Sequence, residues 1–484
     1  MARSAKGDGA AARSAKGDGA AARSAKGDGA AARGAKGDGA AARSAKGSGS
    51  AAHDARAVAL DVITRVRTED AYANLALPAA LSAARLTGRD AGLATELVSG
   101  TLRMQGAYDA VIDQVVPKSP RPRVRDILRM GAHQLLSMRI PDHAAVSTTV
   151  ALAKQPERGF VNAVLRKIAA RTLDEWLAGR DLATRYSHPR WVVDALAEAV
   201  GGDEIEALLA ADNLPPRVVL VARPGRAARE ELPGEPTAYS PYGVVLAGGS
   251  PGEVPAVAEG RAGVQDEGSQ LVAIVAANAP LTGRDERWLD LCAGPGGKSA
   301  LLAALAAERG AGLTANEAQP HRAGLVRQNV SSDGGLVDGA VGVVAGDGNR
   351  PPFAPGTFDR VLVDAPCTGL GALRRRPEAR WRRRPEDLEV LVPLQQSLLT
   401  SALELVRPGG VVTYSTCSPV LAETKFVIET ILNGRSDLDL LDVGPLLPNE
   451  EVLGGAGSPL SRTAQLWPHR HGTDAMFIAV LRRQ

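Results

Sequence analysis

Two of the three cysteines in this sequence end predicted strands. Cys367 lies in the segment V-D-A-P-C-T-G, and Cys417 lies in the segment T-Y-S-T-C-S. Ligands of open parallel sheets bind at the carboxyl ends of the strands, and a cysteine thiolate there is an effective nucleophile. A buried cysteine is more often a small packing group, but two of them at strand ends beside a glycine-rich turn favour covalent catalysis. Cys292 lies within that turn and suits packing better.

The glycine-rich turn separates a predicted buried strand from a predicted helix. It runs from Leu289 to Ser299 as L-D-L-C-A-G-P-G-G-K-S. Glycines let a ligand approach the backbone, and a helix N-terminus offers free N–H groups. The Walker A spacing fails because a cysteine stands where glycine is required, and the dinucleotide spacing fails at Ser299. S-adenosylmethionine is the better remaining ligand, and a purely structural turn is the alternative. The predicted cofactor residues of the turn are Cys292, Ala293, Gly294, Pro295, Gly296, Gly297 and Lys298.

Three acidic residues end neighbouring predicted strands. Glu317 ends the strand after the turn, where a carboxylate can accept hydrogen bonds from both ribose hydroxyls of a cofactor. Asp347, in the segment A-G-D-G, ends the next strand, where a carboxylate can meet the adenine amino group. Asp364 ends the strand that leads to Cys367. We therefore expect these three carboxylates to complete the cofactor site.

An arginine-rich segment directly follows the Cys367 loop. Guanidinium groups suit phosphate oxygens, and an indole ring suits the face of a base. A solvated charged loop is the alternative, but the position beside the predicted catalytic loop favours nucleic-acid binding. The predicted RNA-binding residues are Arg374, Arg375, Arg376, Arg380, Trp381 and Arg382.

The elements that must position these residues follow from hydrophobic periodicity. Apolar residues at helical spacing predict a bundle of five to seven helices, with Pro78 among the turn signals. From Val264 on, alternating strands and helices predict a mostly parallel α/β sheet. The predicted regions are 1–50, 51–180, 181–264 and 265–484, the third being a small α+β subdomain with a strand at 217–222. The last region should hold strands at 288–292, 312–317, 341–345, 358–364, 410–416 and 476–481. It should hold helices at 299–308, 385–406 and 423–432, and one that follows the strand 312–317 and runs to about 329.

The composition of the 484 residues bounds the class of protein. Residues 1–50 are five near-copies of A-A-R-S-A-K-G-D-G-A with a net charge of +6. The remaining residues total −3, so the overall net charge of +3 is no evidence for nucleic-acid binding. We predict that these repeats are disordered, with a weak electrostatic tether to RNA as the functional alternative. No apolar stretch is long enough for a membrane span. Three cysteines in a chain of this length indicate a reducing cytoplasm rather than a disulfide scaffold.

These motifs together resemble a known family. The glycine-rich turn, the D-A-P-C motif ending at Cys367, the arginine-rich segment with Trp381 and the S-T-C-S motif around Cys417 look like the RNA cytosine-5 methyltransferases of the NOL1/NOP2/Sun family. The segment G-V-Q-D-E-G-S-Q, from Gly263, is similar to the family's sequence before its first strand. The resemblance covers roughly residues 185–484.

The helical region adds a second resemblance. G-A-H-Q-L-L from Gly131 and F-V-N-A-V-L-R from Phe160 look like the NusB-like RNA-binding domain. This pairing is similar to the RsmB-type ribosomal RNA methyltransferases. It implies an all-α NusB-like bundle, then a Rossmann-like S-adenosylmethionine-dependent methyltransferase domain with a mostly parallel seven-stranded sheet.

The resemblance also implies an activity and its residues. It implies methyl transfer to C5 of a cytosine in RNA, with 16S rRNA as the expected substrate. Cys417 would add to C6 of the base, and Cys367 would assist release of the product. Asp364 would hydrogen-bond the N3/N4 edge, and Lys298 would orient the base or lower a thiol pKa. We expect no metal, no membrane and no obligate protein partner.

Two other classes of protein share part of these features. A DNA cytosine-5 methyltransferase uses the same chemistry but takes its nucleophile from the Pro-Cys motif, which would leave the Cys417 motif unexplained. A noncatalytic RNA-binding or antitermination factor would need only the helical region and no cofactor site. The full set of motifs therefore favours an RNA methyltransferase.

Overall fold

The computed structural model describes residues 54–138, 140–332, 335–448 and 460–484, all within one compact unit, Ala51–Gln484. The predicted disordered repeats at 1–50 lie outside the described residues. Within the described residues, none of the helices combines the length and the apolar character needed to cross a membrane.

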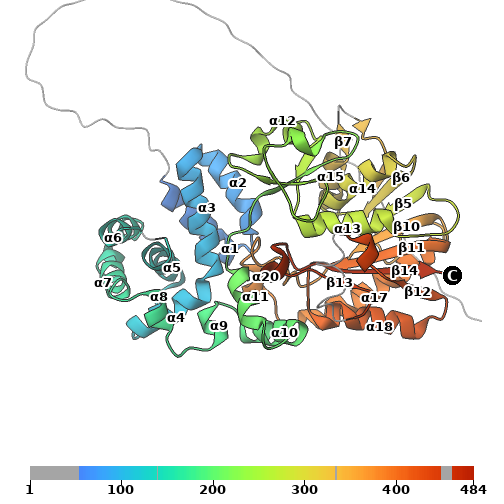
Figure 1. Ribbon diagram of the computed structural model, residues 1–484. Helices are drawn as coiled ribbons and strands as arrows, with labels where there is room; N and C mark the ends of the chain where they lie inside the picture. Colours follow the sequence, from blue (N-terminus) through green and yellow to red (C-terminus); the bar gives the residue numbers. More distant parts are fainter. Residues whose placement is uncertain (1–53, 139, 333–334, 449–459) are drawn as a thin grey trace, which may run out of the picture. The chain divides into compact units, whose positions relative to one another are not determined.

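The first described region is helical, as predicted (Figure 1). Apolar residues recur at helical spacing, and Leu97, Ile112 and Ile127 from three different helices are completely buried in a shared core. Pro78 does not separate two helices as predicted but lies inside α2, on an exposed position. The helices are α1 (Ala55–Thr68), α2 (Ala73–Ala84), α3 (Gly88–Arg103), α4 (Gln105–Val115), α5 (Pro122–Leu136), α6 (Asp142–Ala151), α7 (Arg158–Ile168) and the short α8 (Leu173–Leu177).

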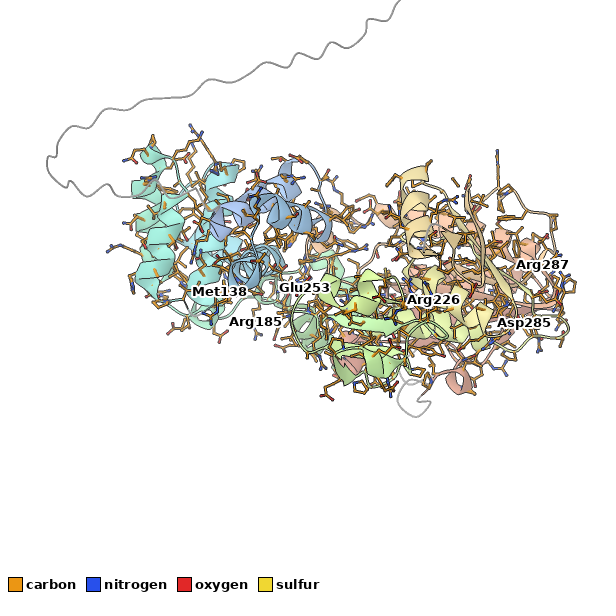
Figure 2. All side chains as sticks on the ribbon, turned by 90° about the horizontal axis from the view of Figure 1, so that it is seen from above. Met138, Arg185, Arg226, Glu253, Asp285 and Arg287 are labelled. Carbon is orange, nitrogen blue, oxygen red and sulfur yellow. The ribbon has the colours of Figure 1, made fainter. Side chains whose placement is uncertain are left out.

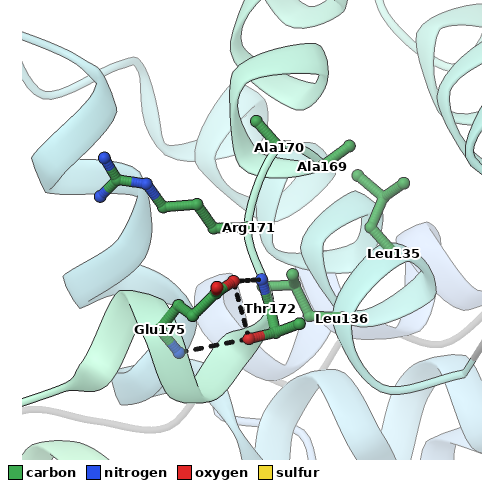
Figure 3. Close-up of a pocket in the computed structure, with 7 residues that line it drawn as sticks. All are labelled: Leu135, Leu136, Ala169, Ala170, Arg171, Thr172 and Glu175. Atoms are coloured by element: carbon green, nitrogen blue, oxygen red, sulfur yellow. Dashed lines mark hydrogen bonds between the residues drawn. The ribbon is translucent and has the colours of Figure 1, made fainter.

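A pocket in this helical region lies beside the start of α8 (Figure 3). Its polar side chains serve the helix itself, because Thr172 caps α8 and the Glu175 carboxylate accepts a hydrogen bond from the Thr172 N–H (2.7 Å). The guanidinium of Arg171 lies 4.9 Å from the ring centroid of Trp176. The remaining lining residues are Leu135, Leu136, Ala169 and Ala170. The pocket therefore carries no group of the predicted chemistry.

The second region combines short helices with a small sheet. Its strand order is β2-β3-β1-β4, and its described pairings are antiparallel. The sequence predicts only one of these strands, because each strand is three or four residues long and periodicity needs a longer run. The elements are α9 (Leu182–Arg185), α10 (Arg190–Val200), α11 (Ile205–Asp212), α12 (Pro255–Ala258), β1 (Val219–Ala222), β2 (Gly234–Pro236), β3 (Gly243–Leu246) and β4 (Ala262–Val264).

The third region is the predicted α/β sheet, with strand order β12-β14-β11-β10-β5-β6-β9. The strands from β11 to β9 pair in parallel, whereas β14 runs antiparallel to β11 and β12. The predicted mostly parallel seven-stranded sheet is confirmed, with the short β13 added beside β14. The strands are β5 (Arg287–Asp290), β6 (Gly312–Glu317), β9 (Ala340–Ala345), β10 (Phe358–Asp364), β11 (Val406–Thr416), β12 (Leu438–Leu441), β13 (Ala464–Gln465) and β14 (Phe477–Arg483).

Helices cover both faces of this sheet (Figure 1). One buried cluster joins α13 (Glu267–Asn278) and α14 (Gly297–Ala307) to one face through side chains such as Trp288. A second cluster joins α17 (Asp387–Leu405) and α18 (Lys425–Gly434) to the opposite face through side chains such as Tyr414. The helix α15 (Pro320–Asn329) packs against β6 and β9. The layers hold the strands rigidly, so their ends can support a precise site.

Ion pairs fasten the amino ends of the central strands. Asp359, at the start of β10, is completely buried and accepts hydrogen bonds from Arg284 (2.9 Å) and Arg407 (2.7 Å). Asp285 accepts one from Arg360 (2.7 Å). Figure 2 shows Asp285 close to Arg287, the first residue of β5. This edge is therefore held by structural charge pairs, and the candidate site lies at the opposite edge.

Candidate active site

The parallel strands bring the predicted chemical groups to one edge of the sheet. β11, β10, β5 and β6 are successive neighbours, so their carboxyl ends lie in a row. β10 ends at Asp364, which is in register with Ser415 near the end of β11. β5 ends at Asp290, directly before the glycine-rich turn. The Pro-Cys motif, the Thr-Cys motif and the turn therefore meet at a common edge.

The two cysteines face each other. Their Sγ atoms are 3.5 Å apart, within hydrogen-bond distance for sulfur, and both residues are half-buried. The hydrogen bond from Cys367 lowers the pKa of Cys417, and the charges of Lys298 and Arg376 lower it further, against burial and Asp364. The same hydrogen bond, together with burial, raises the pKa of Cys367 well above its ordinary value. The arrangement favours a Cys417 thiolate that accepts a hydrogen bond from the Cys367 thiol.

Lys298 and Asp364 form an ion pair beside the cysteines. The Lys298 Nζ donates to Asp364 Oδ2 (2.8 Å), and the Ser415 hydroxyl donates to Asp364 Oδ1 (3.0 Å). Burial acts to lower the pKa of Lys298, but the neighbouring Asp364 carboxylate raises it overall, so the amine stays charged. Both carboxylate oxygens are thus held in fixed directions. The sequence prediction gave Ser415 no role, although it lies within the Thr-Cys motif.

The glycine-rich turn packs closely against Glu317. The Gly294 N–H donates to Glu317 Oε2 (2.9 Å), and a Cβ atom at Gly294 would lie only 2.2 Å from that oxygen. Gly296 has a φ of 112° and precedes α14, a conformation that favours glycine. Arg322 donates to the Gly294 carbonyl (2.6 Å) and pairs with Glu317 (3.5 Å). The prediction missed Arg322, whose only signal was a basic residue in the first turn of α15, shortly after Glu317.

These residues fit S-adenosylmethionine. The turn leads into the N-terminus of α14, where backbone N–H groups are available to a ligand. Both polar side-chain atoms of the buried Gln265 lack a hydrogen-bond partner among the described residues, and Gln265 lies beside Gly297 of the turn. Glu317 ends β6, and the exposed Asp347 follows β9, the positions expected for ribose and adenine recognition. A polar ligand in the turn would satisfy the Gln265 amide.

Cys292 differs from the other two cysteines. Burial raises its pKa well above the ordinary value, and the nearby charges of Asp290 and Asp364 act in the same direction. Its thiol therefore stays protonated and suits the packing role predicted for it. Burial likewise raises the pKa of Asp290 to about 7.

Comparisons with known proteins identify similar families and relatives. Residues 280–482 match the family model "16S rRNA methyltransferase RsmB/F", and residues 53–170 match "NusB family". The ribosomal RNA small subunit methyltransferase B of Pseudomonas putida is 34% identical over 80% of this chain and 91% of its own length. A protein of Mycobacterium tuberculosis named as a methyltransferase is 50% identical over 89% of this chain and 96% of its own.

This chain belongs to the RsmB/F methyltransferase family. The predictions of a methyltransferase with a NusB-like domain and of S-adenosylmethionine as cofactor are thereby confirmed. Solved structures share the fold of this RsmB/F member. The crystal structure named PH0851 has a TM-score of 0.70 and 23% identity, covering 89% of this chain and 98% of its own. NSun6 from Pyrococcus horikoshii has a TM-score of 0.50 and 18% identity, covering 61% and 98%.

The arginine-rich segment (residues 374–384) of this RsmB/F protein departs from its predicted role at Arg380. That residue has no exposed surface, and its guanidinium donates to the carbonyls of Arg103 and Ser187 and to Asn213 Oδ1. Burial lowers its pKa to about 10, while the charge of Asp212 acts in the opposite direction. An RNA contact by Arg380 is therefore a wrong prediction, because its donors are enclosed by protein.

Three more members of the segment also face protein. Arg382 donates to the carbonyls of Val66 and Ala71 in the NusB-like region, and the Trp381 ring packs so closely on Gly106 that a Cβ there would lie 2.4 Å from it. Arg374 donates to the carbonyl of Gly472, with a distance of 2.9 Å. The segment thus connects the methyltransferase domain to the NusB-like helices.

The remaining two predicted RNA-binding residues are placed differently from each other. Arg375 makes an ion pair with Asp266 (2.6 Å) and a second with Asp474 (3.1 Å). Arg376 is exposed and lies close enough to Cys417 to lower its pKa. Arg376 is therefore the member of the predicted set that remains available to a substrate near the thiols.

Proposed function

We propose that this chain transfers the methyl group of S-adenosylmethionine to C5 of a cytosine in 16S rRNA, with Cys417 as the nucleophile. The observation that carries the proposal is the 3.5 Å approach of two cysteines whose pKa values shift in opposite directions. A reaction that needs one thiolate and one thiol at the same base would use such an asymmetric pair. The rRNA substrate is supported by relatives such as the ribosomal RNA small subunit methyltransferase B of Pseudomonas putida.

The residues of the site suit the chemistry of cytosine. C5 of cytosine is a poor nucleophile, and addition of a thiolate to C6 makes C5 electron-rich. Cys417 would form that C6–S bond. Bound S-adenosylmethionine supplies the methyl group. A base would then take the C5 proton, the electron pair of that C–H bond would form the C5–C6 double bond, and the C6–S bond would break to release the Cys417 thiolate. Cys367 would assist this release.

Lys298 and Asp364 would orient the base. Asp364 is held by Lys298 on one oxygen and by Ser415 on the other, so a hydrogen bond to the N3/N4 edge would have a fixed direction. Such a bond favours protonation at N3, which draws electrons from C6 and promotes attack by Cys417. The base must leave its stack to reach this site, and Arg376 would contact the surrounding phosphates.

The close approach of the two thiols argues against the DNA methyltransferase alternative. That class would use Cys367, in the Pro-Cys motif, as the nucleophile and would leave Cys417, whose sulfur lies 3.5 Å away, without a role. The noncatalytic alternative needs only the NusB-like region and leaves the cysteine pair without a role. A reaction on ribosomal RNA that depends on free thiols is consistent with the cytoplasm as its location.

The proposal is tested with unmodified 16S rRNA and isotopically labelled S-adenosylmethionine. We expect the wild type to produce 5-methylcytidine, identified by mass spectrometry of nucleosides from the digested RNA. Cys417→Ala should abolish transfer while still binding S-adenosylmethionine in calorimetry. Cys367→Ala should accumulate a protein–RNA adduct that survives denaturation. Transfer that persists in Cys417→Ala, or a product methylated elsewhere, would contradict the proposal.

A further inference from the structure

Glu423 is a buried acidic residue that no motif assigned to the site. It ends the short helix η4 (Leu421–Glu423), between the Thr-Cys motif and α18, and has no exposed surface. Among the described residues, no arginine, lysine or histidine forms an ion pair with it within 4.0 Å. Burying a carboxylate is costly unless hydrogen bonds compensate it. Its position therefore calls for a set of strong partners.

Those partners are neutral donors from both cysteine loops. Glu423 Oε1 accepts from the Thr368 N–H (2.8 Å), and Oε2 accepts from the Thr368 and Ser418 hydroxyls, the latter at 2.6 Å. Thr368 directly follows Cys367, and Ser418 directly follows Cys417. The two hydroxyls also lie 3.0 Å from each other. A single carboxylate thus bridges the residues that follow the two thiols.

Further hydrogen bonds fix this bridge in place. Gln395 Nε2, from α17, donates both to Glu423 Oε1 (3.0 Å) and to the Pro366 carbonyl (2.8 Å). The Tyr414 hydroxyl donates to the backbone carbonyl of Glu423 (2.8 Å). The carboxylate of Glu423 is therefore held from α17 and both loops, and its backbone is held from β11. A substitution at Glu423 should therefore change the relative position of the two thiols more than other parts of the structure.

We propose that Glu423 is a positioning residue that holds the Cys367 and Cys417 loops in register, so that the two sulfurs stay in contact. The catalytic role of the Cys367–Cys417 pair in this inference rests on the proposed function, whereas the hydrogen-bonded bridge between the two loops does not. Its charge also contributes, after the Cys417 hydrogen bond, burial and the Cys417 charge, to raising the pKa of Cys367, and Asp364 acts in the same direction. Glu423 thus supports both the distance and the asymmetry of the pair.

Two substitutions separate the bridge from its charge. In Glu423→Gln, the amide oxygen can replace Oε1 and keep the bonds from Thr368 N–H and Gln395. The amide nitrogen can replace Oε2 and donate to the two hydroxyls, which can rotate to accept. In Glu423→Ala the bridge is lost. Asp359→Asn is the matched control, because Asp359 is an equally buried carboxylate at the opposite edge of the sheet.

The first readout needs neither RNA nor activity. Phenylarsine oxide binds two neighbouring thiols together, so its rate of capture by the Cys367–Cys417 pair reports their register. We expect Glu423→Ala to slow capture by about tenfold or more, whereas Glu423→Gln and Asp359→Asn stay within about threefold of the wild type. Capture at the wild-type rate in Glu423→Ala would overturn the inference, whatever the reaction proves to be.

The second readout is steady-state kinetics on 16S rRNA. Glu423→Ala should lower kcat by about tenfold or more with KM for RNA changed by less than about threefold, and Glu423→Gln should restore most of kcat. An equal loss in Glu423→Gln and Glu423→Ala would overturn the bridging role. If Cys417→Ala keeps its activity, the proposed function fails while the capture experiment still decides the role of Glu423.

Discussion

The Cys367 loop and the arginine-rich segment are neighbours in the chain, but the structure uses the side chains of the cysteine pair and of the arginines in opposite ways. Cys367 and Cys417 remain partly open at the strand ends, whereas Arg380 is completely enclosed. Strand direction determines where the cysteines must lie, so their residue type and position were enough to predict their proximity. Charge does not determine the direction of a side chain in a loop, so the arginines were predicted to face RNA although most of them bind groups of the protein. Of these, Arg380 and Arg382 donate to carbonyls of the NusB-like region.

The sharpest test of the cysteine side of this comparison is removal of the charge of Lys298. Its charge helps to lower the pKa of Cys417, so Lys298→Met should raise that pKa and reduce the thiolate present near neutral pH. We expect methyl transfer to fall roughly 100-fold or more, and the pH profile of Cys417 alkylation by iodoacetamide to move to higher pH. Lys425→Met, in α18, is the control, and an unshifted alkylation profile in Lys298→Met would contradict the electrostatic account.

The arginine side is tested by stability. Arg380→Met removes a buried cation and leaves the carbonyls of Arg103 and Ser187 without their donor, so we expect a loss of about 3 kcal/mol in the free energy of unfolding. Arg376→Met, in the exposed position of the same segment, should change it by less than about 0.5 kcal/mol. Urea unfolding of both variants measures the difference. Equal losses in the free energy of unfolding would contradict the conclusion that Arg380 stabilises the fold whereas Arg376 does not.

The pH dependence of stability also tests whether Arg380 is enclosed by protein, because Asp212 lies beside Arg380. Burial raises the pKa of Asp212 to about 7, so the folded protein keeps a proton that the unfolded chain releases near the ordinary carboxyl pKa. This contribution is complete at low pH and is lost as the pH rises toward 7. We therefore expect the stability of the wild type to decline relative to Asp212→Asn between about pH 4 and pH 7.

Glu204 provides a control whose contribution to stability changes with pH in the opposite direction. Its hydrogen bonds from Arg470 and His469 lower its pKa to about 2, so its contribution is lost as the pH falls through the acidic range. Relative to Glu204→Gln, the wild type should therefore weaken only below about pH 4.5. Denaturant titrations over this range compare the three proteins. A constant difference between the wild type and Asp212→Asn across the range would contradict the assignment for Asp212.

The smallest expected effect concerns RNA binding by exposed arginines. Arg376 and Arg384 are the exposed arginines of the segment, and removing one arginine that binds a phosphate should reduce the salt dependence of binding by about one unit of slope. Binding of 16S rRNA by Arg376→Ala and Arg384→Ala is measured at several salt concentrations. Arg287→Ala, exposed at the opposite edge of the sheet (Figure 2), is the control. If the salt dependence of RNA binding changes only in Arg287→Ala, the assignment of Arg376 and Arg384 as phosphate-binding residues is contradicted.

The sequence predicts the regular parts of this fold closely. The strands Gly312–Glu317 and Phe358–Asp364 lie where periodicity placed them, because most residues of each strand are buried and clear turn signals bound both runs. The strands β2, β3 and β4 of the small sheet and the strand β12 were missed, because runs of three or four residues carry too little periodicity.

The candidate site was predicted unevenly for a physical reason. Candidate residues at strand ends, such as Cys417 and Asp364, were predicted to lie together because the topology of parallel strands brings their ends together. Glu423 was missed because its role depends on hydrogen bonds with Thr368, far away in the sequence, which no local pattern records. The enclosure of Arg380 was missed for the same reason, since its partners come from the NusB-like region and from α11.

The central claim is that Cys417, and not Cys367, forms the covalent bond to the base. RNA containing 5-fluorocytosine tests it directly, because the fluorine at C5 cannot leave as a proton does and the adduct is trapped. Mass spectrometry of the digested complex should identify the modified cytosine on the peptide that contains Cys417, in the wild type and in Cys367→Ala alike. An adduct on the peptide that contains Cys367 would contradict this assignment. RNA that is bound and methylated without forming an adduct would also contradict it.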